Sequence, residues 1–459
     1  MTAPTPALQD LSALLPADIV ELDPGIVASR ARDLSHFTPG GAPVMVLAPR
    51  TTTEVSACLT VAYRHGLAVV PRGAGTGLSG GANAPDGSVV VSLHRMNKIL
   101  EINAIERLAV VQPGVVTGLL RERVAGSGLY YPPDPGSVDS CTIGGNVATN
   151  AGGMCCLKYG VTGDYVLGLE VVLADGRVTR VGRRTVKGVA GYDLTRLFVG
   201  SEGTLGVITE ITLRLLPRAR VPSTLVAPFD TLEAAGNAVV ALGRAGLRLS
   251  MLEIMDSTTV QAVEALTRMG LTDIAALLVI QSDEPDADEI LGEASAICSS
   301  CDATETFAST DPAEADLLLA ARRNAFPALE RLGDPMLDDV AVPRSSITSL
   351  IAEVQRIAST YKLRIGVFGH AGEGNLHPTI IYDRADADSR NAAVRAFADI
   401  TAAALALGGT VTGEHGVGRL KTAWLARESD AVALALHRAV KAAFDPRGIM
   451  NPGNVITAA

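Results

Sequence analysis

A glycine-rich stretch from Pro71 to Gly81 most constrains what this chain can fold into. It follows a short apolar run at residues 67–70, which we expect to form a strand. The glycines at positions 73, 75, 77, 80 and 81 lack Cβ atoms and can adopt positive φ, so successive N–H groups can turn toward one point. Such a loop suits a pyrophosphate, although a loop of this kind is also typical of a flexible turn.

The stretch does not match the two most familiar phosphate-binding loops. Its glycine order differs from Gly-x-Gly-x-x-Gly, and residues 88–93 resemble a second strand where a dinucleotide fold would place a helix. No Gly-Lys-Ser/Thr sequence closes the loop either. We therefore expect a phosphate cradle that is neither a Rossmann turn nor a P-loop.

Composition excludes several classes of protein. The net charge of −10 and the scattered basic residues argue against nucleic-acid binding, and no apolar run reaches membrane-spanning length. The first residues lack the pattern of a signal peptide, and the six cysteines do not suggest a disulfide framework. We expect a cytoplasmic protein of two or three domains with reduced thiols.

The N-terminal half suggests one ligand-binding domain. Residues 1–40 look like a helical lead-in, and a strand at 44–49, a helix at 53–65 and the strand at 67–70 form a β-α-β unit. A second run of glycines and small polar residues occupies 132–153. Two such runs in one domain favour a long ligand that lies between them.

The character of the chain changes near residue 223. Before it, we expect a hairpin at 166–181 and a strand at 207–215. After it, helices and strands alternate, which indicates an α+β domain. The clearest of these later elements are helices at 231–245, 312–332 and 347–361 and a strand at 275–280.

Three histidines and a glutamate form a second centre of chemistry. A strand ends at His370, a tight glycine-rich connection follows, and His377 begins the next extended run. Glu414 and His415 lie together in another glycine-flanked turn. Each histidine alone is more typical of a hydrogen-bonded core residue, but two His and one Glu are a common catalytic metal set. His415 could accept a proton from a metal-bound hydroxy acid.

These motifs resemble those of the FAD-linked D-2-hydroxyacid dehydrogenases of the vanillyl-alcohol-oxidase fold, which include D-lactate dehydrogenase (cytochrome type) and the catalytic subunit of glycolate oxidase. The resemblance covers roughly residues 40–455 and rests on Pro71–Gly81, Pro133–Gly153, the histidine motifs and Asn451-Pro452-Gly453. It implies an α+β protein with a bipartite PCMH-type FAD-binding domain, an α+β cap domain and a C-terminal segment that returns to the flavin. The implied divisions are 1–40 (lead-in), 41–222 (FAD-binding domain), 223–414 (cap, with substrate and metal) and 415–459 (C-terminal segment).

The resemblance also implies roles for individual residues. The metal, zinc or manganese, would be held by His370, His377 and Glu414, with His415 as the base and Arg322 on the substrate carboxylate. The implied FAD contacts are Arg72, Gly73, Ala74, Gly75, Thr76, Gly77, Ser79, Pro135, Gly136, Thr142, Gly145, Asn146, Ala148, Gly152, Ile208 and Asn451.

Substrate choice follows from two positions. Members that oxidise D-2-hydroxyglutarate carry a Thr and a Lys where this chain has Phe326 and Leu337. The resemblance therefore implies a small or apolar 2-hydroxy acid, such as D-lactate or glycolate, with D-2-hydroxyglutarate as the alternative because Arg344 could compensate. Arg323 is an alternative to Arg322 for the substrate carboxylate. Electrons would pass to a cytochrome, a quinone or an electron-transfer flavoprotein.

Two functions from other classes compete with oxidation. An ether-lipid synthase of the same fold typically has a triple-histidine run where this chain has Gly413-Glu414-His415. A non-catalytic flavin subunit would not need the His-His-Glu set. We also expect a possible homodimer and a peripheral membrane contact through a partner.

Overall fold

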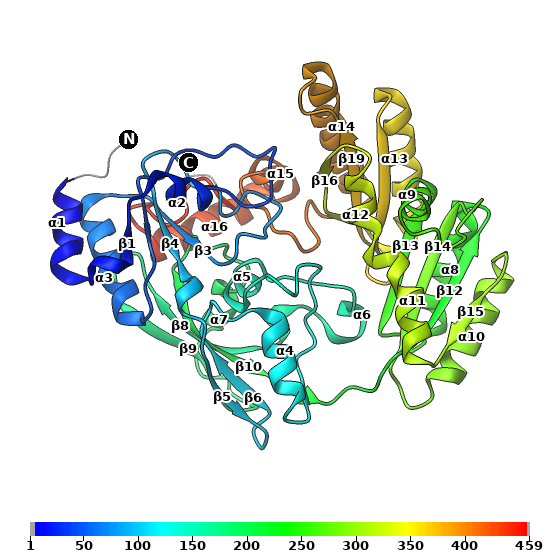
Figure 1. Ribbon diagram of the computed structural model, residues 1–459, viewed down its shortest axis with the longest axis horizontal. Coiled ribbons are helices and arrows are strands. Elements are labelled where there is room, and N and C mark those ends of the chain that lie inside the picture. Colours follow the sequence, from blue (N-terminus) through cyan, green and yellow to red (C-terminus); the bar gives the residue numbers. More distant parts are fainter. Residues whose placement is uncertain (1–4, 457–459) are drawn as a thin grey trace. The chain divides into compact units, whose positions relative to one another are not determined.

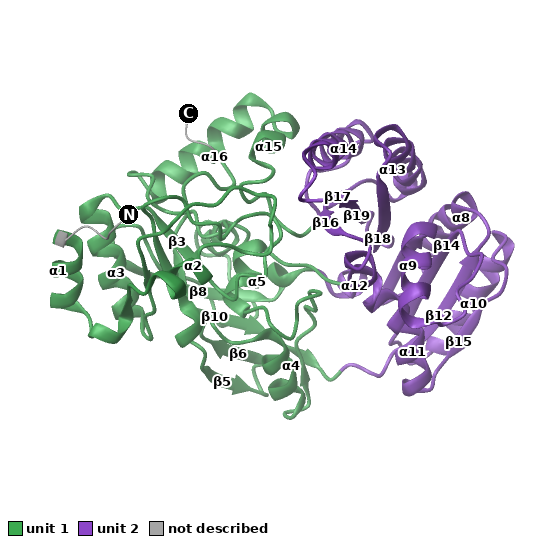
Figure 2. Cartoon of the chain, turned by 45° about the horizontal axis from the view of Figure 1, so that its top comes forward, with its two compact units in different colours: residues 1–153, 161–218, 414–459 green, residues 154–160, 219–413 purple. Residues whose placement is uncertain are grey.

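The computed structural model describes residues 5–456, and the chain divides into two compact units. Unit 1 consists of the stretches 1–153, 161–218 and 414–459, and unit 2 of 154–160 and 219–413 (Figure 2). Each unit mixes helices and strands, so the predicted α+β class is confirmed. Residues 154–160, which the sequence analysis includes in the FAD-binding domain, group with unit 2.

Unit 1 contains two main sheets. The four-stranded sheet has the order β1-β2-β4-β3 and consists of Val20–Glu21, Met45–Leu47, Val89–Ser92 and Val69–Arg72. The five-stranded antiparallel sheet has the order β5-β6-β10-β8-β9 and consists of Ile99–Asn103, Leu108–Val111, Val207–Arg214, Val166–Val172 and Val178–Gly182. A short pair, β7 (Leu129–Tyr130) and β11 (Leu216–Pro217), completes the strands. The helices are α1 (Thr5–Leu14), α2 (Pro24–Ser29), α3 (Thr52–His65), α4 (Thr117–Ala125), α5 (Ile143–Thr149), α7 (Leu194–Phe198), α15 (Thr422–Glu428) and α16 (Ala431–Phe444) (Figure 1).

The predicted β-α-β unit is present as β2, α3 and β3. Thr51 caps α3 by accepting the N–H of Glu54, whose carboxylate returns to the backbone of Thr51 in a capping box. The apolar face of α3 packs into a core with β2, β3 and β4. β2 and β3 both pair in parallel with β4, so the carboxyl ends of these three strands lie at one edge of the sheet. The glycine-rich stretch continues from β3 at this edge, where ligands usually bind in α/β folds.

The C-terminal part of the chain returns to this sheet, as the sequence predicts. Met450 forms a parallel bridge with Val69 of β3, and the N–H of Asn451 donates to the carbonyl of Val69 over 2.7 Å. Ile449 and Met450 are buried in the same core as α3. Two segments far apart in the sequence thus meet beside the start of the glycine-rich stretch.

Unit 2 is built on one eight-stranded sheet. Its order is β15-β12-β14-β13-β18-β19-β16, with β17 also pairing with β19. The strands are Phe307–Ser309, Ser223–Phe229, Ala276–Ser282, Met251–Asp256, Arg364–His370, Asn375–Tyr382, Asp334–Leu337 and Val340–Ala341. The helices are α6 (Cys156–Tyr159), α8 (Leu232–Ala245), α9 (Ser257–Thr267), α10 (Ala287–Ser300), α11 (Pro312–Arg323), α12 (Ala325–Glu330), α13 (Ile347–Tyr361) and α14 (Ala387–Ala406).

One predicted helix is wrong. The helix expected over 312–332 is two helices, α11 and α12, that meet at Asn324. Pro327 explains the break, since it has no N–H to donate to the carbonyl of Arg323 four residues earlier. Within residues 5–456, no helix combines the length and apolarity needed to cross a membrane.

Candidate functional site

The two glycine-rich runs touch each other within unit 1. A Cβ added to Gly73 would lie 2.5 Å from the hydroxyl oxygen of Thr142, closer than real Cβ atoms approach. Thr142 is the N-cap of α5 and accepts the N–H of Gly145 over 3.4 Å. The first run must therefore lack a side chain where Thr142 passes it, so the two runs lie in contact, as a shared FAD cradle would require.

Residues 32–34 of the N-terminal segment contact the first glycine-rich run. The sequence did not predict this contact. Arg72 donates to the carbonyl of Arg32 over 2.7 Å, and the N–H of Leu34 donates to the carbonyl of Gly77 over 3.0 Å. The carboxylate of Asp33 accepts the N–H of Ala82 over 3.3 Å. Burial raises the pKa of Asp33, although its backbone hydrogen bonds act in the opposite direction. An isolated acid in an irregular segment gave no signal of this role.

Several side chains that are predicted to contact FAD form hydrogen bonds to other residues of the protein. The hydroxyl of Ser79 donates to the carbonyl of His415 over 3.1 Å, and the amide of Asn146 donates to the hydroxyl of Thr117 over 2.7 Å. The amide of Asn451 donates to the carbonyls of Gly81 and Glu202 over 2.8 and 2.7 Å. These hydrogen bonds hold other segments of unit 1 against the two glycine-rich runs. The other residues that the sequence analysis assigns to FAD also belong to unit 1.

Glu202 is a buried carboxylate that the sequence analysis did not single out. It accepts the N–H of Val417 over 2.8 Å and that of Gly418 over 2.9 Å, so it anchors the turn that directly follows His415. Burial raises its pKa to about 7, and the N–H groups of Gly418 and Val417 only partly oppose that effect.

The raised pKa predicts a dependence of stability on pH. Between the usual glutamate value of 4.5 and about 7 the folded chain holds a proton that the unfolded chain has released, so stability falls as pH rises through this window. The full loss of stability across this window is about 3 kcal/mol. We expect urea unfolding at one fixed FAD concentration to show a smaller pH-dependent loss for Glu202→Gln than for the natural chain. Parallel profiles of the two proteins would contradict this expectation.

The histidine hairpin forms as the sequence predicts. β18 and β19 are antiparallel, with Phe368 opposite His377 and His370 opposite Asn375. Because side chains alternate along a strand, His370, Phe368 and His377 share one face of the sheet. The two imidazole rings lie 5.2 Å apart at their centroids, and both histidines are buried.

Arg322, the predicted substrate residue, reaches the same face of unit 2. It lies in the last turn of α11, with its guanidinium carbon 4.8 Å from the centroid of the Phe368 ring. Its Nε donates to Glu253 of β13 over 2.6 Å, and the other carboxylate oxygen of Glu253 lies 2.7 Å from Nδ1 of His370. Burial alone would raise the pKa of Glu253, but its close contacts with His370 and Arg322 outweigh burial and lower this pKa.

A second buried carboxylate stands beside His377. Asp339 accepts the hydroxyl of Thr412 over 2.7 Å and the N–H of Gly413 over 2.9 Å, and it lies 3.6 Å from Nδ1 of His377. Gly413 is followed directly by Glu414 and His415, so Asp339 holds the turn that leads into both residues. Neither Glu253 nor Asp339 was singled out from the sequence, although an acid inside the apolar run 251–255 is an unusual feature.

The donor set of the predicted metal site is compatible with a divalent cation. One ligand atom each of His370, His377 and Glu414 lies within 4.8 Å of the others. A second group of this kind consists of Asp339, His377 and His415. Two imidazoles and a carboxylate suit zinc or manganese and leave coordination positions for a substrate.

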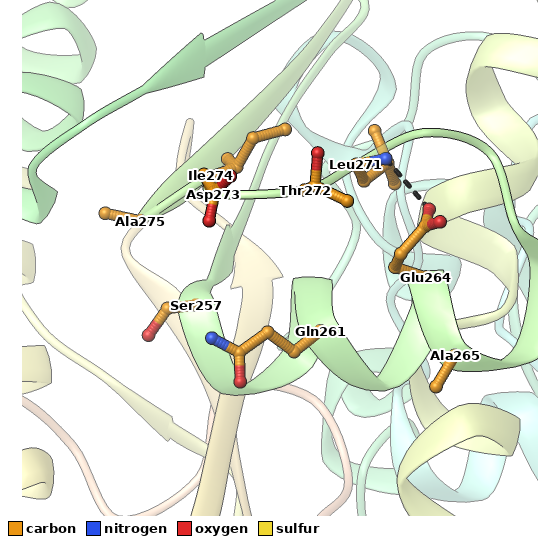
Figure 3. A pocket seen from close by; sticks show the side chains of 9 residues that line it. All are labelled: Ser257, Gln261, Glu264, Ala265, Leu271, Thr272, Asp273, Ile274 and Ala275. Carbon is orange, nitrogen blue, oxygen red and sulfur yellow. Dashed lines mark hydrogen bonds between the residues drawn. The ribbon is translucent and has the colours of Figure 1, made fainter.

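A hollow of about 590 Å³ elsewhere in unit 2 does not contain these residues. It lies between α9 and the segment before β14, and Glu264 in its wall accepts the N–H of Leu271 over 2.8 Å (Figure 3). None of the nine residues that line it is a predicted site residue. The histidine hairpin remains the better candidate in this unit.

Comparison with known proteins decides the family. The model of the FAD linked oxidases, C-terminal domain, matches residues 218–455, and the FAD binding domain model matches 43–182. The chain belongs to the FAD-linked oxidase family. The chain is 44% identical over 417 residues to glycolate oxidase subunit GlcD of Bacillus subtilis, a match that covers 90% of this chain and 89% of the relative. It is 36% identical over 450 residues to D-lactate dehydrogenase of Archaeoglobus fulgidus, with 96% of each chain covered.

Solved structures confirm the fold of this FAD-linked oxidase. p-Cresol methylhydroxylase superimposes with a TM-score of 0.81 at 20% identity, covering 98% of this chain and 96% of that one. Alkyldihydroxyacetonephosphate synthase gives 0.76 at 18% identity, covering 98% and 86%. At these identities the likeness shows the fold alone. The resemblance noted from the sequence is thus confirmed, and FAD is the cofactor that the family assigns to unit 1.

Proposed function

We propose that this FAD-linked oxidase converts a small D-2-hydroxy acid, such as D-lactate or glycolate, to the 2-oxo acid. The observation that carries the proposal is the histidine hairpin with Arg322 beside it, in a chain whose relatives are named for glycolate and D-lactate. A cation needs ligands that project from a rigid scaffold, and the strands β18 and β19 provide one. We assign a zinc or manganese ion to His370, His377 and Glu414.

The reaction divides between the cofactors and the chain. FAD, when bound, supplies the hydride acceptor, and a divalent cation, when bound, lowers the pKa of the substrate hydroxyl. Arg322 binds the substrate carboxylate and so fixes the orientation of the α-carbon. His415 accepts the hydroxyl proton on a ring nitrogen. Both electrons of the C–H bond leave with the hydride, so the product is the 2-oxo acid. A cytochrome, a quinone or an electron-transfer flavoprotein would then take the electrons.

The substrate side chain should be short or apolar. Phe326 and Leu337 offer no polar group for a second carboxylate, and Leu337 is buried. Burial of an unpaired carboxylate is costly, so the site should reject D-2-hydroxyglutarate.

A panel of D-2-hydroxy acids tests this proposal. We expect kcat/KM for D-lactate, glycolate or D-2-hydroxybutyrate to exceed that for D-2-hydroxyglutarate by about 100-fold or more. The assay would follow an artificial electron acceptor with the FAD- and metal-loaded protein. A preference for D-2-hydroxyglutarate would contradict the assignment and point to Arg344 as a second anion-binding group.

A further inference from the structure

Glu253 is an acidic residue in an otherwise apolar part of strand β13. Its neighbours Leu252 and Ile254 are buried, and Glu253 itself has no exposed surface. The register of β13 with β18 pairs Ile254 with Gly369, so the next step along the strands sets Glu253 opposite His370. A charged residue is rarely buried so completely unless it is paired.

Each carboxylate oxygen of Glu253 has its own partner. Oε1 lies 2.7 Å from Nδ1 of His370, and Oε2 accepts from Nε of Arg322 over 2.6 Å. Because an ionised carboxylate only accepts hydrogen bonds, Nδ1 of His370 carries the proton and Nε2 carries the lone pair that can bind a metal. Because Glu253 uses Nε of Arg322, the two terminal nitrogens of the guanidinium can still form the forked contact that a substrate carboxylate prefers.

We propose that Glu253 is a positioning residue that serves the metal and the substrate carboxylate together. It fixes the tautomer and orientation of His370, and the same side chain directs Arg322, whose guanidinium also stacks on Phe368. This inference rests on the proposed function, since it assumes that His370 binds a metal and Arg322 a substrate. It adds that one side chain of β13 sets the distance between those two sites.

A neighbouring acid on the same strand provides a matched control. Asp256 is also buried, but its Oδ1 accepts the N–H and hydroxyl of Thr259 and the N–H of Val367. It therefore caps α9 and connects this helix to β18. Asp256→Asn retains the oxygen that accepts all three bonds, and its effect should be confined to folding stability.

The test compares Glu253→Gln and Glu253→Asp with Asp256→Asn and the natural chain. Glutamine has one accepting oxygen and would turn its NH2 group toward one of the two donors, whereas aspartate keeps the charge but is too short to reach both. We expect both Glu253 variants to bind Zn²⁺ 10- to 100-fold more weakly in a chelator competition. At saturating Zn²⁺, KM for D-lactate should rise about 10-fold or more, whereas FAD content stays unchanged.

The outcomes separate the inference from the proposed function. If the Glu253 variants lose thermal stability but retain the natural Zn²⁺ affinity and KM, Glu253 is merely structural and the inference is overturned. The inference is also overturned if Asp256→Asn lowers Zn²⁺ affinity as much as the Glu253 variants do. If the natural chain binds no divalent ion, the proposed metal site itself fails, and this inference fails with it. The inference is supported if Zn²⁺ binding is weakened and KM is raised in the Glu253 variants but not in Asp256→Asn.

Discussion

Replacement of His415 by alanine is expected to abolish the reduction of bound FAD by D-lactate, with a loss of about 100- to 10,000-fold in rate. The reason is that the hydroxyl proton must leave as the hydride departs, and His415 is the proposed acceptor. The imidazole is half-buried, and its Nε2 lies 3.7 Å from the carboxylate of Glu414. The hydroxyl of Ser79 donates to the backbone carbonyl of His415, a bond that alanine retains, so the substitution should leave this contact intact.

Anaerobic stopped-flow absorbance of the flavin measures this effect. His437→Ala is the matched control. His437 is exposed on α16, so this substitution also removes one imidazole, but from the surface of the protein. We expect that control to behave as the natural chain and His415→Ala to retain its FAD. A rate of bleaching in His415→Ala within a few-fold of the natural rate would eliminate this histidine as the base.

Removal of the metal should have the second large effect. His370 and His377 are buried, and each provides one of only three protein ligands in the proposed set. Loss of either imidazole should therefore weaken binding of the cation. Treatment with a chelator should lower flavin reduction by D-lactate about 100-fold or more while FAD stays bound, because none of the three proposed metal ligands is among the proposed FAD contacts. About one equivalent of Zn²⁺ or Mn²⁺ per FAD should restore the rate.

His377→Ala provides the genetic version of this experiment. It should be inactive and should not recover on addition of Zn²⁺ at concentrations that reactivate the natural chain. His65→Ala, which removes a histidine paired with Asp10 on unit 1, is a control that keeps the metal set. Full activity of a chelated protein that contains less than about 0.1 metal ion per FAD would show that the reaction needs no cation.

The sequence predicted best where local chemistry determines structure. The β-α-β unit around α3 is a property of neighbouring residues, and it forms as expected, with a capping box of Thr51 and Glu54 at the start of its helix. The hairpin that joins His370 and His377 is equally local, because a short glycine-rich connection leaves little alternative. Pro327 could have indicated the break between α11 and α12, but the apolar period of the whole segment hid it.

What sequence reasoning missed are the buried acids. Glu253, Asp339 and Glu202 each bind partners that are about 70 to more than 200 residues away, so no local pattern identifies those partners. Their roles follow only from the tertiary pairing of strands and turns. Burial makes such acids costly unless they are paired, which is why an acid within an apolar strand is the one signal that could have led to Glu253.

The most direct test of the account is anaerobic mixing of the FAD- and Zn²⁺-loaded protein with D-lactate or L-lactate, followed by the visible absorbance of the flavin. The proposed proton acceptance by His415 and carboxylate binding by Arg322 would fix one face of the substrate. We therefore expect rapid and complete bleaching by D-lactate and, with L-lactate, a rate at least about 100-fold lower. Flavin that stays oxidised with D-lactate, glycolate and D-2-hydroxybutyrate alike would contradict it.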